Sequence, residues 1–380
     1  MVSLNRAQEP DKPNVGLTTV RQIAMNHTIN RREFVTTTTA LAGAGLLSTL
    51  PGLAAAATDP TASLVAHPPA GFAPLALPGR VVKVSAKGDF TSFMHKNQIW
   101  PKAEVAKSLL ERALTELTGA PNMVEAIKKF IHKDDIVAIK PNGIAGQSMC
   151  TSFEVIAPLV EACIAAGVPP EHITVYEQFS SYLLSTRVGA PKFDLPKGVG
   201  MAVHNNKDFP MPGVKVYEGI TTKYCRPFMA ATAVINLGLV KDHSICGYTG
   251  ALKNITHGSI NNPEAHHQHA ANPQIAMLYA HPIVTSRVRL HIAEGFRLMY
   301  NGGPLYKSPN SVIPHGSIYA ATDPVALDTI GSDAVDKERK NHNMRTLAEV
   351  GRASKYIQTA GELGLGMAHL DKIRFKTVEI

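Results

Sequence analysis

The chain of 380 residues has few of the side chains that hold iron–sulfur clusters or zinc ribbons. Its four cysteines are Cys150, Cys163, Cys225 and Cys246, and no two of them form a C-x-x-C pair. This spacing argues against a cysteine-held iron–sulfur cluster and against a zinc ribbon. Any cofactor of this chain is therefore expected to use other ligands.

Long apolar runs and dense basic patches are also scarce. Beyond residue 57 no run reaches the ~18 apolar residues that a membrane-spanning helix needs, so we expect no stable membrane span there. Lys and Arg outnumber Asp and Glu by 38 to 30, but the basic residues are scattered and aromatic residues make up only 6% of the chain. This pattern excludes the usual nucleic-acid-binding surface and is compatible with attraction of a small anionic substrate.

The first 57 residues resemble a twin-arginine (Tat) export signal. Residues 30–35 read NRREFV, an apolar run follows at 40–53, and four alanines at 54–57 suit a cleavage site. Met25 starts a more ordinary signal and is an alternative start of translation. We therefore expect an interaction with the Tat translocase and a periplasmic or extracellular location. Residues 58–80, rich in Pro and Ala, predict an extended arm before a domain at 81–380.

The pattern of the domain predicts an α/β fold. Continuous apolar strands are expected at 136–142, 173–176 and 231–237, and shorter ones at 81–85, 289–293, 317–321 and 373–378. Helical spacing is seen at 102–117, 122–130, 154–166 and 323–335, and the tail at 353–370 predicts a helix and a turn. This order indicates a mostly parallel or mixed sheet with helices on both faces, in one domain or two lobes.

Histidine is concentrated in one segment. Residues 241–269 read KDHSICGYTGALKNITHGSINNPEAHHQH and contain five of the sixteen histidines of the chain. Imidazole is a common metal ligand and moves protons near neutral pH. Because the segment follows the expected strand 231–237, we place it at the carboxyl end of a strand, where α/β proteins bind ligands.

Lys253 and His243 are the candidate catalytic residues. Lys253 lies in a glycine-containing turn, and burial near histidines would suit a nucleophile, a base or a cofactor anchor. The alternative is a surface lysine or a simple charge for a substrate carboxylate. His243 is a candidate acid or base, or else a loop histidine bonded to backbone.

Four further histidines are candidate metal ligands, namely His257, His266, His267 and His269. On a helix, His266 and His269 would share a face, so that two imidazoles and a distant third ligand could bind a metal ion. A solvated, histidine-rich loop is the alternative. Lys140 and Asn142 end a predicted strand and are candidates for binding an anionic cofactor or substrate, or else form an ordinary turn.

Six motifs resemble the DUF362 family, whose members lack a settled activity. They are IKPN (139–142), VIN with KDH (234–236 and 241–243), GYTGALKNITHG (247–258), HIAEGFRLMYNGGP (291–304), DPVALD (323–328) and ELGLG (362–366). Many relatives carry cysteine-rich, ferredoxin-like segments, which this chain lacks. Many also have Asp where this chain has Glu294, a change that keeps the carboxylate.

The segment HSICGYTGALK is also similar to one loop of the nickel-pincer lactate racemases. In those enzymes the lysine carries a covalently attached nickel cofactor, a histidine ten residues earlier helps to move the substrate proton, and a later histidine binds nickel. The resemblance implies these roles for Lys253, His243 and His269. Ala251 and Leu252 stand where the racemases favour Gly and Arg, which weakens the implied nickel site.

Three hypotheses follow for the function. The first is an exported, metal- or cofactor-dependent enzyme that transfers a proton or hydride on a small polar or anionic substrate, as a racemase or an oxidoreductase does. The second is a non-catalytic metal-binding or accessory protein of the cell envelope. The third is a small-molecule binding protein that uses no metal. The metal, the substrate and the oligomeric state are left open by the sequence.

Overall fold

The structure is a computed structural model that describes residues 61–217 and 219–380. The strands are β1 (Arg80–Ser85), β2 (Val137–Lys140), β3 (Ile173–Glu177), β4 (Gly200–Val203), β5 (Val214–Lys215), β6 (Thr221–Thr222), β7 (Ala233–His243), β8 (Gly247–Tyr248), β9 (Val288–Met299), β10 (Val312–Ala321) and β11 (Arg374–Glu379). The α-helices are α3 (Phe90–Phe93), α4 (Ala103–Thr118), α5 (Met123–Ile127), α6 (Phe153–Ala165), α7 (Ser180–Ser185), α8 (Arg226–Ala230), α9 (Gly250–His257), α10 (Gln268–Ala271), α11 (Gln274–Ala280), α12 (Pro282–Thr285), α13 (Pro324–Asn341) and α14 (Lys355–Glu362).

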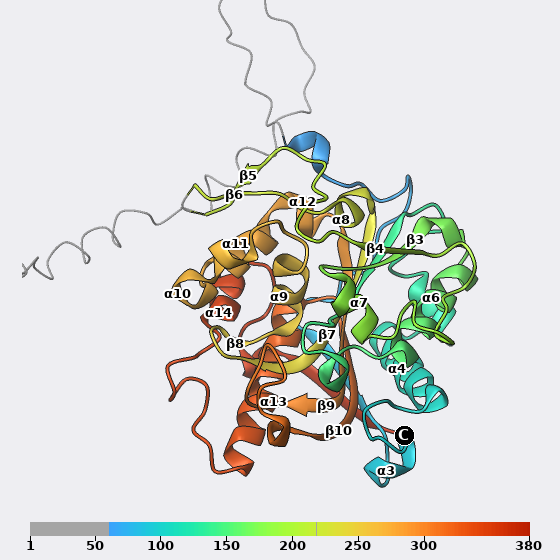
Figure 1. Cartoon of the computed structure of the whole chain (residues 1–380). Coiled ribbons are helices and arrows are strands. Elements are labelled where there is room, and N and C mark those ends of the chain that lie inside the picture. Colours follow the sequence, from blue (N-terminus) through green and yellow to red (C-terminus); the bar gives the residue numbers. More distant parts are fainter. Residues whose placement is uncertain (1–60, 218) are drawn as a thin grey trace, which may run out of the picture. The chain divides into compact units, whose positions relative to one another are not determined.

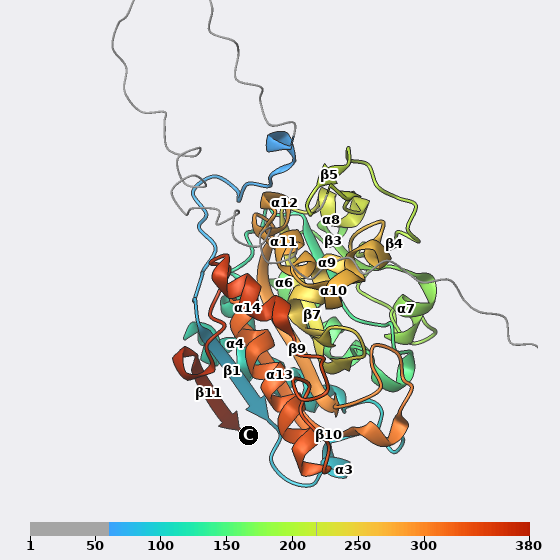
Figure 2. The ribbon, with the colours of Figure 1, turned by 90° about the vertical axis from the view of Figure 1, so that its left-hand side faces the viewer.

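One mixed sheet forms the centre of the described chain. Its strand order is β11-β1-β10-β9-β7-β2-β3-β4, with β8 paired to β7 outside this path. The stretch from β9 through β7, β2 and β3 to β4 is parallel, whereas β10 runs antiparallel to both β9 and β1. At the far edge β1 and β11 lie side by side in parallel (Figure 2). The prediction of a mostly parallel or mixed α/β sheet is confirmed.

Helices cover both faces of this sheet. The helices α4, α5 and α6 pack on one face, and their apolar side chains share one core with β2, β3, β7 and β9. On the opposite face lie α9, α11, α13 and α14 (Figure 1). The central strands β2 and β3 are buried on both sides, which explains their unbroken apolar runs. The described residues belong to one compact unit rather than to two lobes.

Strand β7 is longer than its apolar run predicts, because it continues through three polar residues to His243. Lys241, Asp242 and His243 are each at most 2% exposed. Asp242 forms an ion pair of 2.9 Å with Arg352, which compensates for burying its charge. The expectation that the Lys/His segment starts after the strand is therefore wrong, since its first three residues belong to the strand itself.

The export signal at 1–57, with the alternative start at Met25, lies outside the described residues. Residues 61–79 run along the domain with little regular structure beyond a short 3-10 helix at Ala62–Leu64. The backbone of this segment bonds to the domain, for instance from Leu77 N–H to Thr322 Oγ1 at 2.7 Å. In the described part of the chain, no helix has both the length and the apolar character needed to cross a bilayer.

Candidate active site

The carboxyl ends of β2 and β3 form one wall of the candidate site. Lys140 ends β2 and Glu177 ends β3, and their side chains form a buried ion pair with Nζ and Oε1 3.1 Å apart. The Glu177 carboxylate also accepts hydrogen bonds from the backbone N–H groups of Gly143 at 2.9 Å and Gln178 at 2.6 Å. Lys140 donates a second hydrogen bond to the carbonyl of Pro141. This wall is therefore compensated in charge before any ligand binds.

The opposite wall is helix α9, in which every residue is buried. Asp328 of α13 accepts hydrogen bonds from the N–H groups of Ala251 and Leu252 in the first turn of α9, so that a carboxyl group distant in sequence satisfies the helix start. Gly250 begins the helix at φ +56°, and a Cβ there would lie 2.4 Å from the Asp328 carboxyl carbon. Burial raises the pKa of Asp328 to about 8 against the effect of these backbone donors.

A buried chain of amides joins the two walls. Asn142 donates from its side-chain nitrogen to Asn254 Oδ1 at 2.9 Å, and Asn254 donates to Asn236 Oδ1 at 2.8 Å. Lys241 donates to Asn142 Oδ1 at 3.1 Å and to the carbonyl of Pro304 at 3.0 Å. Because each side chain fixes the next, this network holds α9 against the ends of β2 and β7.

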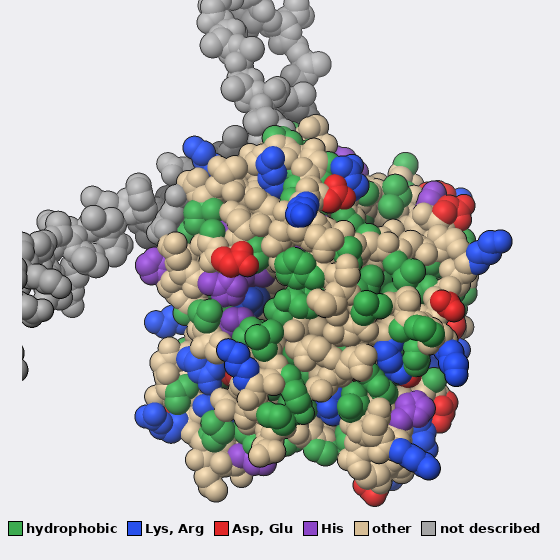
Figure 3. Space-filling model, viewed as in Figure 1, with side chains coloured by type: hydrophobic (Ala, Val, Ile, Leu, Met, Phe, Trp, Pro, Cys, Tyr) green, Lys and Arg blue, Asp and Glu red, His purple; other side chains and the backbone are tan. Residues whose placement is uncertain are grey.

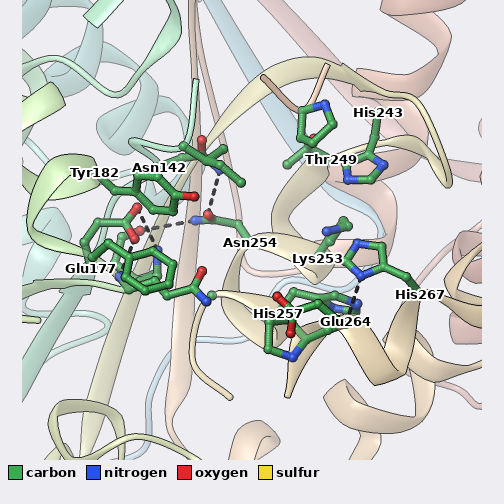
Figure 4. A pocket seen from close by; sticks show the side chains of 17 residues that line it. Asn142, Glu177, Tyr182, His243, Thr249, Lys253, Asn254, His257, Glu264 and His267 are labelled. Atoms are coloured by element: carbon green, nitrogen blue, oxygen red, sulfur yellow. Dashed lines mark hydrogen bonds and ion pairs between the residues drawn. The ribbon is translucent and has the colours of Figure 1, made fainter. Parts of the chain in front are cut away.

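A cavity of about 170 Å³ opens between these walls. Figure 4 shows Lys253, His243, His257 and His267 around one part of it, with Asn142, Glu177 and Tyr182 across from them. In Figure 3 histidine and lysine side chains gather in a hollow with an acidic side chain beside them. The lining residues are Lys140, Asn142, Ile144, Glu177, Gln178, Phe179, Tyr182, His243, Thr249, Lys253, Asn254, His257, Gly258, Pro263, Glu264, His267 and Pro304.

Lys253 differs from the other two lysines of the site. It is 8% exposed and lines the cavity, yet its amine has no hydrogen bond or ion pair within the described residues. Burial lowers the pKa of Lys253 from its usual range, and this outweighs the opposing effects of Cys246 and Glu264. An amine that faces a cavity in this way is available to a ligand.

Three imidazoles surround this amine. The ring of His267 lies 4.8 Å from that of His257 and 5.6 Å from that of His243, centre to centre. Burial, followed by the charge of Lys253, lowers the pKa of all three rings, that of His267 to about 4 and those of His243 and His257 further below their usual range. All three are therefore neutral at pH 7.

The backbone partners of two of these rings assign their tautomers. His243 Nδ1 faces the N–H groups of Ile245 at 3.2 Å and Cys246 at 3.4 Å, so Nδ1 accepts and the neutral ring carries its proton on Nε2. His267 Nδ1 faces the carbonyl of Pro263 at 2.8 Å, so Nδ1 donates and Nε2 keeps a free lone pair. No partner of either Nε2 is found in the described residues. One ring thus provides a donor and the other an acceptor.

The predicted pair of His266 and His269 does not share a helical face. His266 lies within a 3-10 helix at Pro263–His267, where its Nε2 lies 2.7 Å from Thr222 Oγ1. His269 is exposed in a left-handed conformation at φ +52°, so the backbone reverses between the two residues. Neither of them lines the cavity. Their shared face was wrongly predicted, because a local pattern of HHQH does not reveal this kink.

His257 is bonded at both nitrogens, with Nδ1 3.2 Å from Thr256 Oγ1 and Nε2 3.3 Å from the carbonyl of His266. In the described part of the chain, no three or more His, Cys, Asp or Glu side chains are arranged to hold a metal ion. The donor set therefore does not fit a preformed metal site. The four cysteines are free and buried, and burial raises the pKa of the Cys246 thiol to about 12, so the thiol is protonated at pH 7.

The structure brings six of the candidate residues to one cavity, namely Lys140, Asn142, His243, Lys253, His257 and His267. Several of their neighbours were not predicted. Lys241 was read only as part of a motif, although it is completely buried and its pKa is lowered to about 7 by burial first and by Lys253 second. Glu177, at the end of β3, was not assigned to the site. A charged residue directly after a continuous apolar run is the signal that identifies both. Tyr182 comes from a segment without a motif, and Glu264 lies within the histidine-rich segment 241–269 but was not singled out.

The fold and the cavity define an α/β protein with a polar, lysine-containing site at the carboxyl ends of parallel strands. A family model described as "Domain of unknown function (DUF362)" matches residues 137–333. This match covers more than half of the chain, and the chain belongs to the DUF362 family, as its motifs predicted. It contains β2, β3, β7 and α9, which carry most of the cavity.

Comparisons with curated proteins and with solved structures do not identify an activity. No curated protein matches the chain. Among solved structures, the lactate racemase apoprotein from Thermoanaerobacterium thermosaccharolyticum aligns with 72% of this chain and 61% of its own, at 11% sequence identity and a TM-score of 0.38. The chain thus spans less than two thirds of that protein, and the likeness is weak.

Proposed function

We propose that this protein is an enzyme that binds a small anionic substrate in the cavity and moves a proton of that substrate. One observation carries the proposal. The Lys253 amine faces the cavity without a partner while three neutral imidazoles surround it. Burying an amine without a counter-charge costs folding free energy. Such groups are concentrated at sites that bind an anion or that react with a substrate.

The charges of the cavity support an anionic substrate. Of the lysines that line it, Lys140 is neutralised by Glu177, whereas Lys253 has only the charge of Glu264 nearby, without an ion pair to it. A carboxylate or a similar anion beside Lys253 would complete the pair and raise the pKa of its amine. The volume of about 170 Å³ lies below the ~300–1,000 Å³ of sites for drug-sized ligands, which favours a substrate of a few heavy atoms.

The two tautomers support a division of roles in proton transfer. His267 presents a lone pair on Nε2 and acts as the base, while His243 presents an N–H and stabilises the negative charge that develops on a substrate oxygen. Lys140 and Asn142 frame the cavity and keep their internal bonds, so they shape the site for substrate or cofactor. His257 positions the ring of His267.

The experiment follows exchange of substrate hydrogen for deuterium by NMR in deuterium oxide, with short 2-hydroxy and 2-oxo carboxylates as candidates. We expect saturable exchange with at least one of them. Replacing His267 by Gln is expected to reduce the exchange ~100-fold or more. The matched control is His172→Gln, since His172 is exposed on the 3-10 helix Pro170–His172 far from the cavity lining. Unchanged exchange in His267→Gln would remove the acid–base proposal.

An organic cofactor attached to Lys253 is the second candidate, and the free amine favours it. Elemental analysis and intact mass of protein purified from its native host separate the options. A covalent mass increment on the peptide with Lys253 would support a cofactor enzyme, a nickel-type cofactor included. An exchangeable metal bound without hydrogen exchange would support an accessory metal-binding protein.

We also propose that the protein is exported through the Tat pathway to the periplasm or beyond. The support is the twin arginine, Arg31 and Arg32, ahead of an apolar run and four alanines. Replacing both arginines by lysine is expected to keep the folded protein in the cytoplasm, which cell fractionation measures. Unaltered export of this variant would contradict the proposal.

A further inference from the structure

We propose that Lys253 forms a covalent imine with the carbonyl carbon of a small oxo acid, an inference that rests on the proposed function and names its substrate class. The cavity places a free amine, a hydrogen-bond donor and a base next to each other. These are the three groups that imine chemistry needs.

The contrast among three lysines singles out Lys253. The amine of Lys140 is held by Glu177 and by the carbonyl of Pro141, and the amine of Lys241 by Asn142 and by the carbonyl of Pro304. Both are fixed as parts of the scaffold. Lys253 alone among them has an amine without a bond to the described chain, and this amine reaches the cavity. Its lowered pKa increases the neutral fraction that can act as a nucleophile.

The step balances without an oxidant or a reductant. The lone pair of Lys253 Nζ attacks the carbonyl carbon, a C–N bond forms, and the C–O π bond opens to an oxyanion that accepts a hydrogen bond from His243 Nε2–H. The nitrogen loses a proton to His267 Nε2, and the protonated His267 passes this proton to the oxyanion, which gives the neutral carbinolamine. His267 then takes a proton from solvent and gives it to the hydroxyl group, the C–O bond breaks, water leaves, and the nitrogen lone pair forms the protonated imine, while His243 keeps its proton throughout. Abstraction of a proton next to the imine carbon then yields an enamine.

The wall formed by the carboxyl ends of β2 and β3 offers a hydrogen-bond donor to the carboxylate of such an oxo acid. An ammonium has three N–H groups, and Lys140 uses two of them for Glu177 and Pro141. The third is available to a carboxylate that enters the cavity. Phe179 and Tyr182 stand on the same side, with ring centres 5.1 Å apart, and both line the cavity. They limit the space beyond the carbonyl group and favour short oxo acids.

The test is reductive trapping. The purified full chain is incubated at pH 7 with glyoxylate, pyruvate or 2-oxobutyrate and with sodium cyanoborohydride, and the product is digested and mapped by mass spectrometry. We expect a stable alkyl adduct on Lys253 with at least one oxo acid. Lys253→Arg keeps a cation but cannot form an imine, and Lys253→Met removes both properties, so neither should be labelled there. Lys133→Ala, which alters an exposed surface lysine, serves as control and should label like the unaltered chain.

Calorimetric measurement of the binding of the same oxo acids distinguishes a failure of the imine inference from a failure of the proposed function. Saturable binding and deuterium exchange without any adduct on Lys253 would overturn the imine and leave the proposed function in place. Absence of binding, exchange and adduct with all three acids would overturn both. An adduct spread over many surface lysines, and equal in Lys253→Arg, would reflect general amine chemistry and would also overturn the inference. Thermal unfolding of each variant verifies that it is folded.

Discussion

Lys241 offers a stringent test of the electrostatics of this site. Its side chain is completely buried in β7, and burial together with the charge of Lys253 lowers its pKa from 10.5 to about 7. In the folded protein at pH 7 the amine is therefore close to losing its proton, whereas in the unfolded chain it keeps the proton up to about pH 10.4. We predict that Lys241→Met removes a pH-dependent part of the stability.

The direction in which the free energy of unfolding changes with pH follows from the number of protons that each state binds. Below pH 7 both states hold the proton, and folding bears the whole penalty of burying the charge. Between pH 7 and 10.5 the unfolded state binds one proton more than the folded state, so the stability of the unaltered protein rises with pH. At ~1.4 kcal/mol per pKa unit, a shift from 10.5 to about 7 corresponds to ~5 kcal/mol over the whole range.

The measurement is the free energy of unfolding in urea at pH values from 7 to 9.5, for the unaltered chain, Lys241→Met and the control Lys133→Met. At pH 7 the variant loses the hydrogen bonds to Asn142 and Pro304 but also the buried charge, so its stability there should change little. As the pH rises, the unaltered chain should gain ~3 kcal/mol relative to Lys241→Met. The control should follow the unaltered chain in parallel.

Two results would refute this reasoning. A difference between the unaltered chain and Lys241→Met that stays constant within ~0.5 kcal/mol would mean that Lys241 has an ordinary pKa. If the unaltered chain instead lost stability relative to Lys241→Met as the pH rises, the folded state would favour the charged amine. As a further check, Lys253→Met should raise the pKa of Lys241, because Lys253 is the largest charge contribution that lowers it.

Three further predictions concern the walls of the cavity. Asp328→Ala leaves two N–H groups of α9 without an acceptor and should lower the free energy of unfolding by ~2–4 kcal/mol in urea titrations, while an unchanged value would show that water replaces the carboxylate. Glu177→Gln leaves the buried Lys140 ammonium without its counter-charge and should cost ~3–5 kcal/mol in the same assay. His267→Gln should slow hydrogen exchange while calorimetry shows binding of the anion within ~3-fold of the unaltered chain, and a parallel loss of both would make His267 a binding group instead.

Helices and strands were predictable where residues close in sequence determine where the element begins and ends. A helix was expected at 323–335, and α13 begins there, with Asp323 accepting from Ala326 N–H at 2.8 Å as its cap. Strand β3 was expected at 173–176 and is observed at Ile173–Glu177, because its apolar residues are buried on both faces. By contrast, β4 is a short edge strand of Gly200–Val203 whose residues are only partly buried, and it was missed.

The site was predictable in its residues but not in its geometry. Lys253 was expected in a turn because Thr249 and Gly250 precede it, yet it lies in α9. The carboxyl group that accepts from the first turn of this helix belongs to Asp328. It is 77 residues away from Ala251, so no local sequence pattern predicts this hydrogen bond. The tautomers of His243 and His267 likewise depend on backbone groups that only the folded chain brings to their rings.

The bond from Asp328 to the start of α9 also has a consequence for biosynthesis. While the ribosome is still adding residues before 328, the motif that contains Lys253 has already been made, but the first N–H groups of its helix have only water as an acceptor. We therefore expect α9 to gain its full stability only after Asp328 has been added. A product that ends before α13 would carry every motif residue from 241 to 269 and still lack the carboxyl group that caps α9.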